Sequence, residues 1–515
     1  MAGWALSIRT GLGDLNRLSA VMLPTNERVR AANKAPIKER GDYVLYWMTA
    51  FRRASWNHSL DRAIAWSREL NKPLLVLEAL RSDYQWASDR LHKFVVEGMV
   101  DNAKALKRNN VAHYSYVEPE PGAGSGLLTA LANNACVVVT DDYPAFFLPR
   151  MIESAARRLP ILLEAVDSNG LIPLARHEKV YSAAYHFRRF LHGTLQEEPM
   201  DLPKSRPFAG KRLPVLDVLP AEALEKWKPT ELEELSGGAT LIGSLPIDHG
   251  VPPAKARGGR SAGRRALRSF IDTLLQDYGV KRNLPEADAT SGLSPYLHFG
   301  HLSVCEVAQA VFEQQDWTPD LIEPAAKGRR AGWWGVGESA ESFLDELITW
   351  RELGFNAARH QPDSDTYGSL PDWAQKTLAA HQSDIRSHVY AHEQFEYADS
   401  HDPIWNAAQR QLLREGRIHG YLRMLWGKKI LEWSPTPQHA FDIMVDLNNK
   451  YALDGRDPNS YTGILWVLGK YDRPWAPERP VFGTVRYMSS DNTARKFKLK
   501  DYLRRYSSQK RQVSK

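Results

Sequence analysis

Two tryptophans near the end of the chain are spaced so that an electron could pass between them. Trp426 and Trp433 lie seven residues apart in a helical pattern, which puts them on one helix face and separates them by roughly 10 Å along the axis. Indole rings are readily oxidised, and Trp405 lies 21 residues before Trp426. The three rings indicate either a path for electrons or, as the alternative, core aromatics that pack at heptad spacing.

A carboxylate and an aromatic ring share a second helical pattern, from Ser339 to Leu353. Glu346 and Trp350 are four residues apart and therefore lie on one face of the predicted helix. Such a face can offer a hydrogen-bonding group and a stacking surface to one ligand. The alternative is a structural ion pair between Glu346 and Arg351.

A loop rich in hydroxyl groups spans residues 288–300. It offers the side chains of Thr290, Ser291 and Ser294, and its Gly292-Leu293-Ser294-Pro turn exposes backbone N–H groups just before a predicted helix. That arrangement suits a phosphate group. A simple helix cap is the alternative interpretation.

The first half of the chain alternates between short apolar runs and amphipathic segments. The runs at 43–48, 73–77, 136–140 and 161–166 predict buried strands, and residues 59–70, 89–106 and 150–158 predict the helices between them. Strand followed by helix, repeated, predicts a parallel α/β sheet of the Rossmann type.

The pattern changes after residue 196. Residues 197–263 are rich in Pro, Gly and charge and predict a linker along the surface. Strand signals nearly vanish beyond it, while helical periods recur at 266–276, 304–315, 339–356, 405–415 and 420–433. We therefore expect an α/β part followed by an all-α part.

Four long motifs in the second half resemble the class II cyclobutane pyrimidine dimer photolyases, a branch of the photolyase and cryptochrome family. They cover residues 370–378, 401–409, 448–459 and 480–488, and the likeness extends over roughly residues 26 to 503. The resemblance implies a Rossmann-like domain at 26–196, the linker at 197–263, and a helical FAD-binding domain at 264–503. Residues 1–25 are then expected to form a disordered extension and residues 504–515 a basic tail.

The resemblance also implies how a flavin is held and reduced. Trp426, then Trp405, would carry electrons to the flavin, with Trp433 as a third member. Arg423 and Asp454 match a buried ion pair beside the flavin ring, and Asn448 matches the polar residue that faces its N5 atom. The remaining matches to flavin contacts are Tyr278, Thr290, Ser291, Gly292, Leu293, Ser294 and Asp457.

The same resemblance implies a site for damaged DNA. Glu346 would hydrogen-bond the base edge of the dimer, Trp350 and Trp466 would stack on it, and Met424 would pack against it. Arg486 would lie near the DNA backbone, and Tyr390 is a further candidate for the lesion site. Photolyases are a known example of enzymes that extrude the base on which they act, so the expected partner is duplex DNA with its dimer flipped out.

Three departures from the family pattern concern the shape of the pocket. Ser460 stands where glycine is expected, residues 356–360 lack the usual aromatic run, and the segment 317–337 is longer than in many relatives. The sequence does not reveal whether a second, antenna chromophore of the deazaflavin or folate type is bound.

Composition narrows the remaining choices. The net charge of +6 and the 16 tryptophans suit a protein that binds nucleic acid and does redox chemistry. Two cysteines are too few for a zinc site or a disulfide framework, so no metal is expected and the thiols are expected to be free in a reducing compartment, the cytoplasm or the nucleoid of a prokaryote. We also expect a monomer. Two rivals remain: a cryptochrome-like flavin photoreceptor without repair activity, and a nucleotide-binding enzyme, which would lack both a P-loop and a Gly-x-Gly-x-x-Gly motif.

Overall fold

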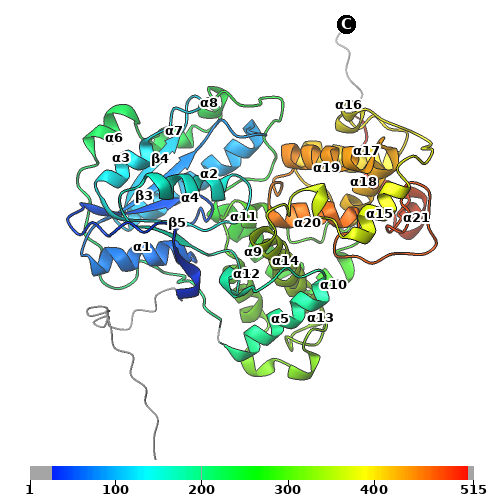
Figure 1. Cartoon of the computed structure of the whole chain (residues 1–515), viewed down its shortest axis with the longest axis horizontal. Helices are drawn as coiled ribbons and strands as arrows, with labels where there is room; N and C mark the ends of the chain where they lie inside the picture. Colours follow the sequence, from blue (N-terminus) through cyan, green and yellow to red (C-terminus); the bar gives the residue numbers. More distant parts are fainter. Residues whose placement is uncertain (1–25, 199, 509–515) are drawn as a thin grey trace, which may run out of the picture.

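The computed structural model describes residues 26–198 and 200–508. An α/β part built around one sheet lies beside a second part made of helices (Figure 1). The expected fold class, a parallel α/β domain followed by a helical domain, is confirmed. The predicted extension at 1–25 lies outside the described residues, as does the predicted tail beyond Ser508.

A six-stranded sheet forms the core of the α/β part. The strand order is β1-β6-β5-β2-β3-β4, and all neighbours are parallel except β1 and β6. The central strands are buried on both faces, which is why they appear in the sequence as continuous apolar runs. The strands are β1 (Val29–Ala31), β2 (Tyr43–Met48), β3 (Leu74–Leu80), β4 (Ala112–Val117), β5 (Ala135–Asp141) and β6 (Leu163–Val166).

Two strands, β4 and β1, were not predicted from the sequence, for physical reasons. The strand β4 reads Ala-His-Tyr-Ser-Tyr-Val, and its polar residues hide the apolar run. The strand β1 has three residues and pairs antiparallel at the sheet edge. Neither carries the signal of a buried parallel strand.

Helices connect the strands and begin at recognisable caps. The side chain of Asn57, for example, accepts hydrogen bonds from the backbone N–H groups of Ser59 and Leu60. The helix α5 leaves the sheet and lies beside the helical part (Figure 1). The helices are α1 (His58–Glu69), α2 (Asp89–Arg108), α3 (Leu127–Asn133), α4 (Leu148–Arg158) and α5 (Ala184–Glu197).

The predicted linker is more ordered than its composition indicates. It contains the short helices α6 (Ala221–Lys226), α7 (Leu232–Ser236) and α8 (Ala239–Gly243). Trp227, Leu235 and Ile242 are buried, and Trp227 belongs to the apolar cluster on the α/β sheet. This segment therefore packs on the α/β part through scattered apolar residues rather than merely running over its surface.

The second part is a compact group of helices. Its helix α9 begins at Arg260, six residues earlier than predicted. The elements are α9 (Arg260–Thr273), α10 (Tyr278–Lys281), α11 (Ser294–His298), α12 (Val304–Gln314), α13 (Glu338–Leu344), the π-helical turn η6 (Asp345–Trp350), α14 (Arg351–His360), α15 (Asp372–Ala380), α16 (His392–Glu396), α17 (Pro403–Glu415), α18 (Gly420–Trp433), α19 (Pro437–Tyr451), α20 (Pro458–Val467), α21 (Ser490–Lys496) and α22 (Lys500–Arg505).

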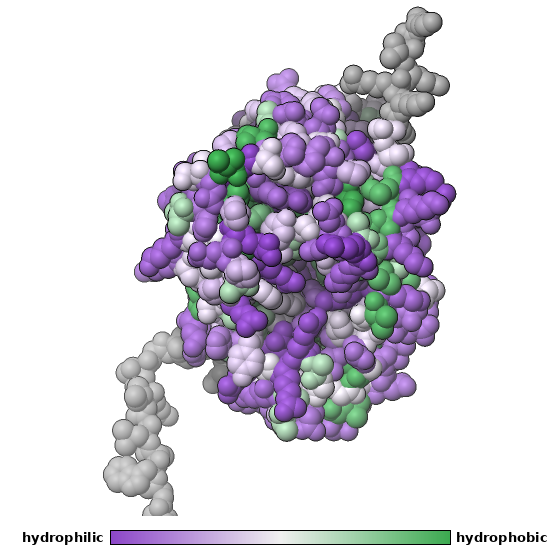
Figure 2. All heavy atoms as spheres, turned by 90° about the vertical axis from the view of Figure 1, so that its right-hand side faces the viewer, coloured by the Kyte–Doolittle hydropathy of each residue, from purple (hydrophilic) through white to green (hydrophobic). Residues whose placement is uncertain are grey.

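Brief 3-10 turns complete the secondary structure, at η1 (Asn26–Arg28), η2 (Leu174–Arg176), η3 (Leu275–Asp277), η4 (Pro319–Leu321), η5 (Pro324–Ala326) and η7 (Tyr367–Ser369). On the face of the molecule that looks right in Figure 1, hydrophilic residues dominate and hydrophobic ones gather in separate patches (Figure 2). No helix among residues 26–198 and 200–508 has the length and apolar character needed to cross a bilayer.

Candidate active site

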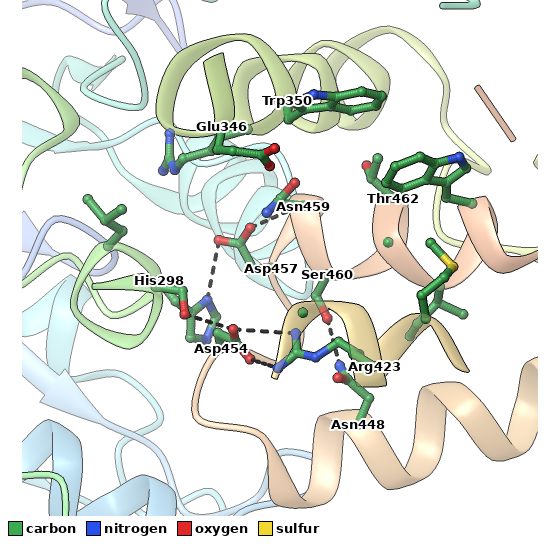
Figure 3. Close-up of a pocket in the computed structure, with 18 of the residues that line it drawn as sticks. His298, Glu346, Trp350, Arg423, Asn448, Asp454, Asp457, Asn459, Ser460 and Thr462 are labelled. Atoms are coloured by element: carbon green, nitrogen blue, oxygen red, sulfur yellow. Dashed lines mark hydrogen bonds and ion pairs between the residues drawn. The ribbon is translucent and has the colours of Figure 1, made fainter. Parts of the chain in front are cut away.

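A cavity of about 350 Å³ opens between the helices of the second part. Segments far apart in the sequence supply its walls, including η6, α11, α18, α19 and α20. Figure 3 shows Glu346 and Trp350 on one side and Arg423, Asn448 and Asp454 on the other. The predicted site residues that line it are Tyr278, Ser291, Leu293, Ser294, Glu346, Trp350, Arg423, Met424, Trp426, Asn448, Asp454, Asp457 and Trp466.

Glu346 and Trp350 reach the cavity from a π-helical turn. The wider turn is fixed from behind by Arg188 of α5, whose guanidinium donates to both oxygens of Asp345 at 2.8 and 3.1 Å. Single π turns inside α-helices are frequent at functional sites. This buried ion pair therefore positions both side chains that the sequence singled out.

The partner of Glu346 differs from the one considered in the sequence. Arg282 donates to the Glu346 carboxylate at 2.6 Å. Burial lowers the pKa of Arg282, but the charge of Glu346 outweighs it and holds that pKa above its usual value. Arg351 instead donates to the Asn169 carbonyl at 2.5 Å, so the alternative Glu346–Arg351 pair is wrong.

Two tryptophans line the cavity and touch each other. The rings of Trp350 and Trp466 are stacked, with centroids 5.0 Å apart and an angle of 19° between their planes. Met424 lines the same cavity. Flat rings exposed to a cavity are stacking surfaces for another planar group.

A partly buried ion pair lies in the wall of the cavity. Arg423 donates to Asp454 at 3.0 Å, and the Ser294 hydroxyl donates to the same carboxylate at 2.8 Å. Burial alone opposes ionisation of Asp454, but Arg423 and Ser294 hold its pKa below the usual value. The carboxylate is therefore ionised at neutral pH and keeps Arg423 in place (Figure 3).

Asn448 is held by the residue that departs from the family pattern. Its side-chain N–H donates to the Ser460 hydroxyl at 2.6 Å, and both residues are buried. Ser460 thus orients the amide of Asn448 toward the cavity (Figure 3). A glycine here would offer no hydroxyl to do so.

Asp457 joins the cavity to the α/β part. Its carboxylate caps α20 by accepting from the Asn459 backbone N–H at 2.8 Å, and it also accepts the hydroxyl of Tyr143 at 3.0 Å. His298 lies 3.5 Å from the same carboxylate. Burial opposes ionisation of Asp457, but His298 and the other contacts hold its pKa below the usual range.

The predicted flavin loop contributes some of its residues directly. Ser291, Leu293 and Ser294 line the cavity, whereas Thr290 and Gly292 are not among its lining residues. Gly292 has a φ of 63°, a conformation that favours glycine. It makes the turn that precedes α11, so its role in the structure is to shape the loop.

The three tryptophans follow one another away from the cavity. Trp426 lines the cavity, and its indole N–H donates to Gln409 at 2.8 Å. The indole of Trp405 donates to the carbonyl of Trp426 at 3.0 Å, and its ring lies 6.0 Å from that of Trp433. The rings are buried, so they satisfy the core-packing interpretation as well as forming a continuous series.

Two predicted substrate residues lie outside the cavity. Tyr390 packs on Trp433, with ring centroids 5.6 Å apart, and is not among the residues that line the cavity. Tyr390 lies in the loop that follows α15, and residue spacing in the sequence does not predict where this loop lies relative to the cavity. Arg486 is exposed and stands over the ring of Trp475 at 5.2 Å.

The other departures from the family pattern leave the cavity intact. The Asn356 side chain accepts from the Tyr181 backbone at 3.1 Å and donates to the Lys179 carbonyl at 2.8 Å. Trp333, from the long segment 317–337, stacks on His192 of α5 with ring centroids 3.8 Å apart. Both features fasten residues 179–192 to the helical part.

Sequence reasoning missed three polar residues around the cavity: Arg282, His298 and Tyr143. Arg282 follows Tyr278 by four residues, and its guanidinium lies over that ring at 5.5 Å, so helical spacing could have revealed it. The contacts of Tyr143 and His298 with Asp457 join residues more than 150 positions apart. No local pattern predicts such contacts.

A second cavity of about 140 Å³ lies where the two parts meet. It opens at the carboxyl ends of β2 and β3, the usual place for a ligand on a parallel α/β sheet. Its wall includes several aromatic side chains, among them Tyr84, Tyr143, Phe146, Phe147 and Phe299. His298 lines both cavities and so lies between them.

The chain is similar to curated enzymes along nearly its whole length. It is 34% identical to the deoxyribodipyrimidine photo-lyase of Methanothermobacter thermautotrophicus, over 93% of this chain and 98% of that protein. It is 30% identical to the enzyme of the same name from Arabidopsis thaliana, over 92% of each. A comparison with models of protein families gives no match.

Solved structures show the same fold at lower sequence identity. A class III photolyase from Agrobacterium tumefaciens superimposes with a TM-score of 0.66 at 18% identity, covering 90% of this chain and 86% of that one. An archaeal photolyase from Sulfolobus tokodaii gives 0.63 at 14% identity, with 91% of each covered. Because a relative with more than 30% identity is matched over nearly its whole length, the chain belongs to the deoxyribodipyrimidine photo-lyase family.

Proposed function

We propose that this protein is a class II photolyase that uses FAD and light to split cyclobutane pyrimidine dimers in DNA. The observation that carries the proposal is the meeting of two predicted groups of residues in one cavity. Glu346, Trp350 and Trp466, expected to contact the lesion, face the same space as Asn448 and Arg423, expected to contact the flavin. A dimer and a flavin held there would lie next to each other.

The residues of the cavity suit a flavin nucleotide. The Nε of Arg423 is buried and has no hydrogen-bond partner among the described residues, so a ligand atom could accept from it. The Asn448 amide is neutral and oriented by Ser460, and the hydroxyls of Ser291 and Ser294 lie in the same wall. We assign Arg423, Asp454, Asn448, Asp457 and the loop 290–294 to FAD, together with Tyr278.

FAD, when bound, supplies the light absorption and the electron that opens the cyclobutane ring. The protein contributes position and electrostatics. Glu346, held by Arg282, hydrogen-bonds the base edge of the dimer, while Trp350 and Trp466 stack on its rings. Because these rings are stacked on each other in the present structure, an incoming dimer must part them or displace one.

DNA is the proposed partner, and the dimer enters the cavity flipped out of the duplex. Arg486 is an exposed cation, held over Trp475, and is suited to contact a phosphate. Trp426, Trp405 and Trp433 supply electrons to oxidised FAD. A cryptochrome-like photoreceptor would share the fold and the flavin, but would have no need for the carboxylate and the two stacked rings at the cavity.

We also assign a light-harvesting chromophore to the second cavity. The photolyase of Sulfolobus tokodaii is described with two FAD molecules, with the implication of a novel light-harvesting cofactor. The second cavity of this chain has aromatic walls suited to a flat ring system and shares His298 with the first. The chemical type of this chromophore stays open.

The proposal is tested by replacing Glu346. The variant Glu346→Ala should keep its flavin, since the Arg423–Asp454 pair is untouched, but should repair dimers in illuminated DNA far more slowly than the wild type. Glu338→Ala, at the exposed start of α13, is the matched control and should repair normally. Normal repair by Glu346→Ala would remove this residue from the lesion site, and absence of repair by the flavin-loaded wild type would refute the assigned activity.

A further inference from the structure

A cluster of three side chains covers the outer end of the tryptophan series. Tyr390, His401 and His388, here called the exit cluster, lie at the surface beside Trp433, which is itself only 1% exposed. The rings of Tyr390 and Trp433 meet edge to face at 5.6 Å, and that of His401 lies 5.0 Å from Trp433. The Tyr390 backbone N–H also donates to the Trp433 carbonyl at 3.2 Å, which fixes the loop against α18.

The hydrogen bonds of the cluster define where the phenol proton points. The Tyr390 oxygen accepts from the backbone N–H of His401 at 3.0 Å and lies 2.6 Å from the Nδ1 atom of the same residue. Because the oxygen already accepts one hydrogen, its own O–H is free to donate to Nδ1 when that nitrogen is unprotonated. A distance of 2.6 Å is within the range for direct proton transfer.

His401 is suited to be the acceptor. Partial desolvation of its ring and the neighbouring His388, stacked on it at 3.8 Å, hold the pKa of His401 below the usual value. The other charges that act on it are those of Asp402, Lys429 and Glu432, and they do not reverse this direction. The imidazole is therefore neutral at neutral pH, with a free lone pair.

Among the described aromatic neighbours of Trp433, Trp405 lies on the inner side and Tyr390 on the outer side. The other rings in contact are those of Phe395 and His401, which are much harder to oxidise. The ammonium of Lys429 lies over the Trp433 ring at 5.3 Å, partly compensated by Glu432 at 2.7 Å. A nearby cation disfavours a positive charge on the Trp433 ring and so favours passing that charge on.

We propose that Tyr390 is the terminal electron donor of this series and that His401 takes its proton. The inference rests on the proposed electron path through Trp426, Trp405 and Trp433. An electron leaves the Tyr390 phenol for the Trp433 radical cation, and the O–H bond breaks as its proton moves to His401 Nδ1. The products are neutral Trp433, a neutral tyrosyl radical and an imidazolium.

The step is balanced and separates charge at the surface. The oxidant is the Trp433 radical cation, which would form if Trp426 loses an electron to bound, photoexcited FAD and the positive charge passes along the series to Trp433. A small thiol in solution restores Tyr390 by giving it a hydrogen atom, and His401 releases its proton to water. Since Tyr390 is partly exposed, the thiol can reach it.

The test uses the flavin-loaded protein in its oxidised state, with electron paramagnetic resonance and transient absorption after a light flash. We expect a tyrosyl radical in the wild type and its loss in Tyr390→Phe, where a tryptophanyl radical remains. Tyr397→Phe is the matched control, because Tyr397 is an exposed tyrosine at the end of α16 and makes no described ring contact with Trp433, so this variant should keep the signal. A tyrosyl signal that persists in Tyr390→Phe would overturn the assignment, as would a wild type that forms only tryptophanyl radicals.

The proton acceptor and the path itself are tested separately. His401→Gln keeps Tyr390 but removes the base, so the tyrosyl radical should form more slowly than in the wild type. We expect heavy water to slow formation of this radical in the wild type but not in His401→Gln. Unchanged kinetics in the variant would refute the role of His401. Trp426→Phe should abolish both radicals. If Trp426→Phe still forms them, the proposed tryptophan path is wrong, whereas loss of both with no effect of Tyr390→Phe refutes only the terminus.

Discussion

Three polar groups at the cavity are each held by a second residue, which fixes the orientation of the group and the hydrogen bonds that it can still make. Arg282 holds Glu346, Ser460 holds Asn448, and Arg423 holds Asp454. Burying these pairs costs little free energy, because each of the three contacts joins a donor to an acceptor, while the Nε of Arg423 is left for a ligand. The side chains that face the ligand are therefore fixed before a ligand arrives, which is the condition for electrostatic preorganisation.

The stacked wall gives a prediction at the scale of one residue. Trp466→Ala should weaken binding of dimer-containing DNA relative to undamaged DNA, because stacking on an extruded base contributes about 1–3 kcal/mol. The measurement is the ratio of the two dissociation constants. Trp466→Phe keeps a flat ring and should retain most of the preference. If Trp466→Ala leaves the ratio unchanged, the ring does not contact the lesion.

The tryptophan series gives a second prediction at this scale. Phenylalanine preserves much of the packing of Trp426 but is far harder to oxidise, so Trp426→Phe should block photoreduction of oxidised FAD. Repair consumes no net electron, so the same variant should still split dimers after its flavin is reduced chemically. The two assays, compared on one preparation, must give different results. Failure of the chemically reduced variant to repair would point to a structural role instead.

At the scale of elements, the buried strands and long helices were predictable because their patterns are local. The strand β2 and the helix α18 match their predicted bounds. The π turn η6 was not predictable, since the Arg188–Asp345 pair that fixes it joins residues 157 positions apart. For the same reason the sequence motifs indicate many of the residues that line the cavity, but not the place of Tyr390, whose backbone N–H donates to the Trp433 carbonyl at the end of α18.

The helix α14 carries a buried carboxyl group that yields a prediction for stability. Glu352 accepts from the Leu171 backbone at 2.7 Å, and its second oxygen is buried without a partner. Burial, opposed by the Leu171 hydrogen bond and by Arg351, raises the pKa of Glu352 to about 7. Folding therefore favours the protonated form, and this contribution to stability is complete below the pKa of the unfolded chain and lost as pH rises through 7.

The variant Glu352→Gln isolates that contribution. The amide keeps an oxygen for Leu171 and cannot ionise, so its free energy of unfolding should lack the fall that Glu352 imposes between about pH 5 and pH 8. The difference between wild type and variant should change by roughly 3 kcal/mol over this range, as measured by urea unfolding. A difference that stays constant with pH would show that Glu352 is ionised in the folded protein or titrates normally.

At the scale of the whole molecule, hydrogen bonds from the α/β part fasten the helices that surround the cavity. Arg90 of α2 is 2% exposed and donates to the carbonyls of Tyr451 at 2.7 Å and Leu413 at 2.6 Å. The Trp86 indole donates to Asp446 at 2.8 Å, and Tyr143 donates to Asp457. The ends of α17 and α19 are thus held by the sheet domain, so the two parts support one site.

The charge of the whole molecule gives the last prediction. A net charge of +6 attracts DNA without regard to position, whereas a specific contact depends on where each cation lies. Arg486→Ala and Arg150→Ala remove one exposed positive charge each, the first beside Trp475 and the second on α4 of the α/β part. If Arg486 contacts a phosphate, its loss should weaken binding and reduce the slope of log affinity against log salt by about 0.9, while Arg150→Ala leaves the slope unchanged. The measurement is the affinity for dimer-containing duplex over a series of salt concentrations. An equal effect of the two variants would mean that the protein attracts DNA through its overall charge and that Arg486 has no special place in the interface.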